Sequence, residues 1–161
     1  MKSIRVVLLL SLFSILFMGC PYGTEVPLDI AAIKVDQKLV GKWESKSSTS
    51  DSYIVTKADE AIYAIQRKSN ASTDVSNYKA YASEISGTKF LNLWEETASP
   101  KVYYLYKFVL SASGSKVTLI PVTENIDEKF TTSAELKKFV QTHMGLSFFY
   151  SKEEDEYFRA D

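Results

Sequence analysis

The feature that most constrains the fold is a regular series of short apolar runs separated by polar or glycine-containing turns. Tyr, Val, Ile, Phe and Thr dominate these runs, as is typical of a half-buried pleated surface. Ser86-Gly87 and Ser113-Gly114-Ser115 are hairpin turn signals between neighbouring runs. The pattern predicts an antiparallel meander whose strands span 39–46, 52–57, 60–67, 77–85, 88–95, 101–111 and 115–123.

One amphipathic helix follows the predicted meander. Thr132 and Glu135 have the spacing of a capping box, and Gly145 offers a C-terminal stop. The helical face repeats at three- and four-residue intervals, through Leu136, Phe139, Val140 and His143. After the helix, the segments LSFFYS and EYFRA supply one or two closing strands. The strand at 101–111 is apolar on both faces, so we expect the helix to cover its second face.

Composition limits the classes of protein that are possible. A chain of 161 residues suits one domain. A net charge of −1 argues against a nucleic-acid partner, because proteins that bind nucleic acids usually present a basic face. One Cys excludes a disulfide framework, and one His excludes most histidine-based metal sites, so we expect no cofactor and no metal.

The N-terminal sequence is typical of a targeting signal. Lys2 and Arg5 precede an apolar stretch over 6–18, which is too short for a comfortable transmembrane helix and matches a signal h-region. The stretch ends in Gly19-Cys20 and resembles a bacterial lipoprotein lipobox. The resemblance implies cleavage after Gly19 and lipidation of Cys20, which is the only cysteine. An ordinary signal peptide with an incidental cysteine is the alternative.

These features divide the chain into three parts. Residues 1–19 are the predicted lipoprotein signal peptide, 20–38 are the lipidated cysteine and a tether that packs partly onto the domain, and 39–161 are the barrel domain. The residue after Cys20 is Pro21 and not the Asp that retains many lipoproteins at an inner membrane. We therefore expect a lipid-anchored protein of the bacterial cell envelope, at the outer membrane if the source has one.

Two short motifs carry a family resemblance. Gly41-Lys42-Trp43 opens the first predicted strand, and Tyr157-Phe158-Arg159 lies in the last. The pair resembles the calycin superfamily, and more narrowly its small lipocalin-like bacterial lipoproteins. The resemblance implies an all-β fold with one helix: an antiparallel up-and-down barrel of about eight strands, with an amphipathic helix before the last strand or strands. It also implies that Trp43 and Arg159 stack at the closed end, with Gly41 giving the backbone room to bend.

Catalytic motifs are missing from the sequence. No Ser lies in an elbow-like motif, no glycine-rich phosphate loop occurs, and His143 is interpreted as a packing or capping residue. The acidic runs at 95–96 and 153–156 are interpreted as solvated charge. We therefore expect no enzymatic activity, and an esterase-like activity is the weakest of the hypotheses.

Aromatic residues are the remaining functional signal, with ten Tyr, nine Phe and two Trp. One hypothesis is a pocket that binds a small hydrophobic ligand. The alternative is an interaction, inhibitor or assembly module that acts on another envelope protein through its surface, with a barrel that these rings fill. A continuous cavity would favour the ligand. The candidate ligand-binding residues are Tyr63, Tyr81, Phe90, Trp94, Tyr104, Tyr106 and Phe108.

Overall fold

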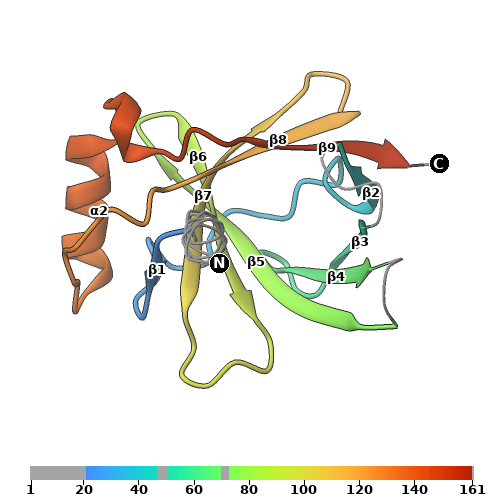
Figure 1. Cartoon of the computed structure of the whole chain (residues 1–161), viewed down its shortest axis with the longest axis horizontal. Coiled ribbons are helices and arrows are strands. Elements are labelled where there is room, and N and C mark those ends of the chain that lie inside the picture. Colours follow the sequence, from blue (N-terminus) through green and yellow to red (C-terminus); the bar gives the residue numbers. More distant parts are fainter. Residues whose placement is uncertain (1–20, 47–50, 70–72, 161) are drawn as a thin grey trace, which may run out of the picture.

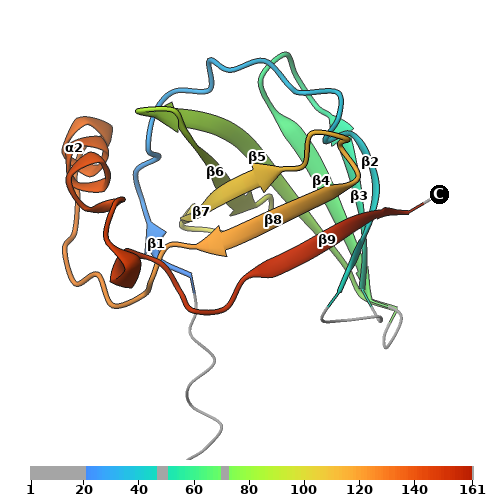
Figure 2. The same ribbon diagram turned by 90° about the horizontal axis from the view of Figure 1, so that it is seen from above.

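The computed structural model describes residues 21–46, 51–69 and 73–160, so Cys20 and the predicted signal peptide lie outside the described residues. Eight antiparallel strands form a closed barrel (Figures 1 and 2), and one helix precedes the last of them. The barrel strands are β2 (Gly41–Ser45), β3 (Asp51–Lys57), β4 (Tyr63–Ser69), β5 (Val75–Ile85), β6 (Thr88–Glu95), β7 (Tyr103–Leu110), β8 (Lys116–Pro121) and β9 (Asp155–Ala160). The predicted fold class is confirmed.

Each barrel strand from β2 to β8 pairs with the next one along the chain, and β9 closes the ring by pairing with both β8 and β2. Turn chemistry explains the simplest connection. Ser86 and Gly87 both have positive φ, 50° and 80°, and they join Ile85 to its cross-strand partner Thr88. Two such residues make the tight turn whose twist matches that of the flanking strands.

A short strand that the sequence analysis did not predict lies outside the ring. This strand, β1 (Gly23–Thr24), pairs with Tyr103 and Tyr104 of β7. Strand β8 pairs with β7 only from Tyr106 onward. Strand β1 therefore occupies the part of the β7 edge that β8 leaves open. An uncovered edge would expose unpaired backbone groups, and the N-terminal segment supplies their partners.

Two apolar clusters stabilise the molecule. One lies inside the barrel and includes Trp43, Tyr63 and Phe108. The other lies outside it, where α2 (Ser133–His143) and the N-terminal segment pack against the wall (Figure 2), and it includes Phe90, Leu105 and Leu136. The barrel wall is therefore buried on both faces over part of its surface.

The cover of β7 differs from the expectation in one respect. Leu105 is fully buried in the outer cluster. It contacts both the N-terminal segment and the chain just after β8. Its amide donates to the carbonyl of Tyr22, and its carbonyl accepts from Val122. Val109, on the same face, remains 50% exposed. The helix therefore covers only one end of this face, and it shares that end with residues near Tyr22.

The helix begins as predicted. The hydroxyl of Thr132 accepts from the amide of Glu135 at 3.3 Å, and the carboxylate of Glu135 accepts from the amide of Thr132 at 3.2 Å. Leu136 and Val140 are buried against the barrel, whereas Phe139 is only partly buried. No helix among the described residues is long and apolar enough to span a membrane.

The segment LSFFYS is not a closing strand. Its central residues form a short 3-10 helix, η2 (Ser147–Phe149), in which Phe149 is 2% exposed and Phe148 is 71% exposed. The residues around Tyr150 pair with the end of β8 through one isolated bridge between Tyr150 and Val122. In this bridge the carbonyl of Phe149 accepts from the amide of Thr123, and the amide of Ser151 donates to the carbonyl of Pro121. This segment turns beside the helix, with Phe149 buried and Phe148 exposed, and adds no strand to the barrel. Strand β9 alone therefore closes the ring.

Candidate ligand-binding cavity

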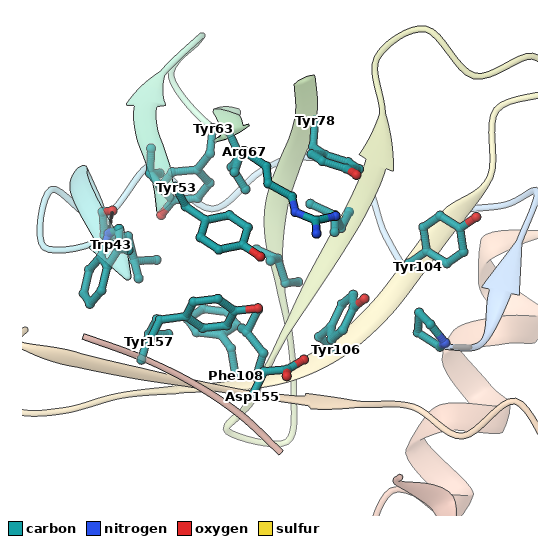
Figure 3. Close-up of a pocket in the computed structure, with 18 of the residues that line it drawn as sticks. Trp43, Tyr53, Tyr63, Arg67, Tyr78, Tyr104, Tyr106, Phe108, Asp155 and Tyr157 are labelled. Carbon is teal, nitrogen blue, oxygen red and sulfur yellow. Dashed lines mark hydrogen bonds between the residues drawn. The ribbon is translucent and has the colours of Figure 1, made fainter. Parts of the chain in front are cut away.

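A cavity of about 440 Å³ occupies the inside of the barrel (Figure 3). Every barrel strand contributes inward-pointing side chains to its lining, because alternate residues of a strand face the same side. The volume lies within the range of pockets that hold small organic molecules. The lining is formed by Pro21, Leu39, Trp43, Tyr53, Val55, Tyr63, Ile65, Arg67, Tyr78, Leu91, Leu93, Glu95, Tyr104, Tyr106, Phe108, Val117, Leu119, Asp155 and Tyr157.

Trp43 closes one end of the cavity. Its ring is 2% exposed, and its indole N–H donates to the carbonyl of Leu39 at 2.9 Å. Trp43 and Arg159 are direct cross-strand partners between β2 and β9, and the guanidinium carbon lies 4.7 Å from the centre of the indole ring. The structure thus brings these two residues together at the end of the barrel where β2 begins and β9 ends.

Arg159 also ties two segments to this end of the barrel: the stretch before β2 and the turn between β7 and β8. Its Nε donates to the carbonyl of Gly114 at 3.2 Å, its Nη1 to that of Val40 at 3.1 Å, and its Nη2 to that of Lys38. Gly41 has a φ of +142°, and a Cβ at this position would lie 2.5 Å from Nη1 of Arg159. Glycine is favoured here by its positive φ, and its missing Cβ leaves room for the guanidinium.

The cavity wall carries several tyrosine hydroxyls among apolar groups. Tyr53 and Tyr157 meet edge to face, with ring centres 5.1 Å apart. Burial raises the pKa of Tyr106 and of Tyr157 far above the usual value of a phenol, and it raises the pKa of Tyr53 and Tyr63 as well. These hydroxyls therefore stay protonated at neutral pH and act as uncharged hydrogen-bonding groups.

Charged side chains gather at the opposite end, which we call the mouth: Arg67, Glu95 and Asp155, near the end of β4, the end of β6 and the start of β9. The guanidinium of Arg67 donates to one carboxylate oxygen of Asp51, at 3.1 Å from Nε and 2.7 Å from Nη2. Pro21 reaches the same lining because β1, which follows it, pairs with the start of β7.

Asp155 differs from Arg67 in its surroundings. Among the described residues, no hydrogen bond or ion pair reaches its carboxylate, which lies beside Tyr106 and Tyr157 in Figure 3. Burial raises the pKa of Asp155, and the charge of Glu153 raises it further. Asp155 is therefore a partly buried lining carboxylate that no cation among the described residues pairs with.

The predicted ligand-binding residues divide into two groups. Tyr63, Tyr104, Tyr106 and Phe108 line the cavity. Tyr81, Phe90 and Trp94 do not, because they point outward from β5 and β6. The hydroxyl of Tyr81 donates to the carbonyl of Asp29, Phe90 belongs to the outer cluster, and Trp94 packs between Tyr81 and Tyr103.

The cavity lining also includes polar and charged residues that were not among the predicted ligand-binding residues, such as Tyr53, Arg67, Asp155 and Tyr157. One signal was available for Tyr157, since it shares a strand face with Arg159 two residues later. For Asp155 the signal was masked by its neighbours. It belongs to the run of acids at 153–156, of which Glu156 points outward and pairs with Lys46 and Lys116 at 2.8 Å each.

The predicted packing role of His143 agrees with its surroundings. Its Nδ1 lies 2.8 Å from the carbonyl of Phe139, and its ring packs against that of Phe139 with centres 4.2 Å apart and planes tilted by 33°. Within the described ranges, no group of three or more His, Cys, Asp or Glu side chains could hold a metal ion.

Fold and site together define a closed eight-stranded antiparallel β-barrel with an internal cavity that is apolar and tyrosine-rich within and charged at its mouth. Comparisons of this chain with protein-family models, with curated proteins and with solved structures find no match.

Proposed function

We propose that this protein is a lipid-anchored envelope lipoprotein of the lipocalin-like type that binds a small, mainly apolar molecule inside its barrel. The observation that supports ligand binding is the cavity of about 440 Å³. An eight-stranded barrel is just wide enough to fill itself with side chains or to hold one small ligand. The space left beside Trp43 and Phe108 favours the ligand over a module with a filled barrel that acts through its surface.

The chemistry of the lining supports binding rather than catalysis. The tyrosine hydroxyls have raised pKa values, so they are poor bases and poor nucleophiles at neutral pH. The contact between Trp43 and Arg159 supports the lipocalin-like assignment, because the resemblance implies this stack. The motif match of Gly19-Cys20 to a lipobox supports the anchor.

Ligand binding is tested with N-phenyl-1-naphthylamine, an uncharged apolar dye whose fluorescence rises in a dry site. We expect the purified protein to bind it, and we expect Leu93→Trp, which fills part of the cavity, to abolish binding while the barrel stays folded. The matched control is Val109→Trp, which adds the same ring at an outward position that is 50% exposed. Equal binding by both variants, or no binding by the unmodified protein, would overturn the proposal.

The anchor is tested separately. Cys20→Ser should move the protein from the membrane fraction to the soluble envelope fraction without changing its thermal unfolding, because the barrel is stabilised by its own clusters. Membrane attachment that persists in this variant would rule out lipidation at Cys20. Native mass spectrometry of the protein from its own envelope would then show any ligand or partner that it retains.

A further inference from the structure

The charges at the mouth of the cavity are unequal. Arg67 is the one basic side chain that lines the described part of the cavity, and Asp51 already neutralises it through two hydrogen bonds. Two further lining side chains, Glu95 and Asp155, are acidic, and no ion pair with either occurs among the described residues. The lining therefore carries a net negative charge.

Asp155 is the acid placed to act on a ligand. Glu95 is exposed at the rim, whereas Asp155 is partly buried and its carboxylate faces the cavity in Figure 3. Figure 3 shows the carboxylate beside Tyr106 and Tyr157, and its charge contributes to the raised pKa of Tyr53, Tyr106 and Tyr157.

Tyrosine rings flank this carboxylate on two sides. Tyr53 and Tyr157 pack edge to face with their planes at 84°, and Tyr106 projects from β7 on the other side of Asp155. Aromatic faces carry negative charge density and attract cations, and a cage of rings is the usual protein site for quaternary ammonium groups. A carboxylate within such a cage adds direct charge attraction in a partly dry site.

We propose that the ligand of this cavity carries one positive charge on an otherwise apolar body, as an amine or quaternary ammonium group held by the carboxylate of Asp155 and by the ring faces of Tyr106 and Tyr157. The apolar body extends toward Trp43 and Phe108 at the closed end. This inference rests on the proposed function and adds the chemical class of the ligand.

The experiment compares three probes that share one apolar tail: octyltrimethylammonium, octan-1-ol and octanoate. Binding to the full folded barrel is measured by isothermal titration calorimetry. We expect octyltrimethylammonium to bind at least tenfold more tightly than octan-1-ol, and octanoate to bind more weakly than either, because Asp155 and Glu95 repel its carboxylate.

Substitutions separate the charge from the rings. Asp155→Asn should reduce the affinity for octyltrimethylammonium to that for octan-1-ol and leave the alcohol unchanged, whereas Glu154→Gln, at the exposed neighbouring position, should change neither. Tyr106→Phe keeps the ring and should retain binding of the cation, while Tyr106→Leu should weaken it. Tyr103→Leu, on the outer face of the same strand, is the control for loss of a ring.

The outcomes distinguish the two proposals. Equal affinity for the cation and the alcohol, or an equal effect of Asp155→Asn on both, would overturn the cationic ligand and leave the apolar binding function intact. Tightest binding of octanoate would also overturn it and would assign the head group to Arg67 instead. Failure of all three probes, together with failure of the uncharged dye, would overturn the binding function itself.

Discussion

Replacing Trp43 with Ala tests how the closed end of the barrel is stabilised. The ring is 2% exposed and donates a hydrogen bond to the carbonyl of Leu39, so its loss removes buried apolar surface and a buried donor. Truncating a buried Trp costs about 3–5 kcal/mol of unfolding free energy. Because one side of this ring borders an existing cavity that water can enter, we expect a value near about 3 kcal/mol.

Thermal and urea unfolding measure this cost. For a domain of this size, about 3 kcal/mol lowers the unfolding midpoint by about 6–12 °C. The urea slope should stay unchanged, because the unfolded chain exposes nearly the same surface. A loss below about 1 kcal/mol would refute the argument that this ring closes the barrel.

Arg159 provides the second part of this test, as a double-mutant cycle of Trp43→Ala with Arg159→Met. Met keeps an apolar stem but removes the charge above the ring. Because Arg159 is exposed, we expect a coupling energy of about 0.5–1 kcal/mol, the range of exposed cation–π pairs. The matched cycle uses Trp94→Ala, whose ring packs outside the barrel with Tyr81, and it should show coupling within about 0.3 kcal/mol. Equal coupling in both cycles would contradict a specific stack.

Three further substitutions probe other parts of the molecule. Leu136→Ala, at a fully buried helix position, should cost about 2–5 kcal/mol in urea unfolding, whereas exposed Lys138→Ala should change stability by less than about 0.5 kcal/mol, and equal costs would contradict the assigned helix face. Asp155→Asn should raise the unfolding midpoint at neutral pH, because burial raises the pKa of the carboxylate in the folded state. This gain in midpoint should shrink as pH falls through the raised pKa toward 3.8. A midpoint at neutral pH that is equal to or below that of the unmodified protein would count against a desolvated acid. Asn92→Ala should cost about 1–3 kcal/mol and expose the N-terminal segment to protease, because it leaves the buried amide of Leu28 without its acceptor at 2.8 Å; an uncleaved segment would show that other contacts hold it.

The barrel strands and the helix could be predicted because their signals are local. The turn at Ser86-Gly87 and the capping box at Thr132 both act within four residues of chain, and the structure contains both. Strand β1 has two residues and hence no periodicity to detect. It forms only because β7 has an unpaired edge beside it, which is a property of the folded barrel.

The cavity could be predicted only in part, for a physical reason. Alternation identifies the inner face of a strand only where the outer face is polar. Strand β6 is mostly apolar on both faces, with Phe90 and Trp94 outside and Leu91 inside, because the outer cluster covers it. The space left inside depends on how large rings from eight strands pack together, which no local pattern encodes.

The N-terminal segment has a consequence for how far the barrel can stand from its anchor. Eighteen free residues between a lipid and a domain would span about 60 Å when extended. Residues 21–38 are not free, since Tyr22 and Leu28 are buried in the outer cluster and Val35 in the inner one. Pro21 itself lines the cavity near its mouth.

If Cys20 carries the lipid, the acyl chains are therefore attached one peptide unit from the rim of the cavity. The barrel would then stay close to the bilayer surface, with the mouth of its cavity near the anchor. Encounters with other molecules would follow lateral diffusion of the anchored protein in two dimensions.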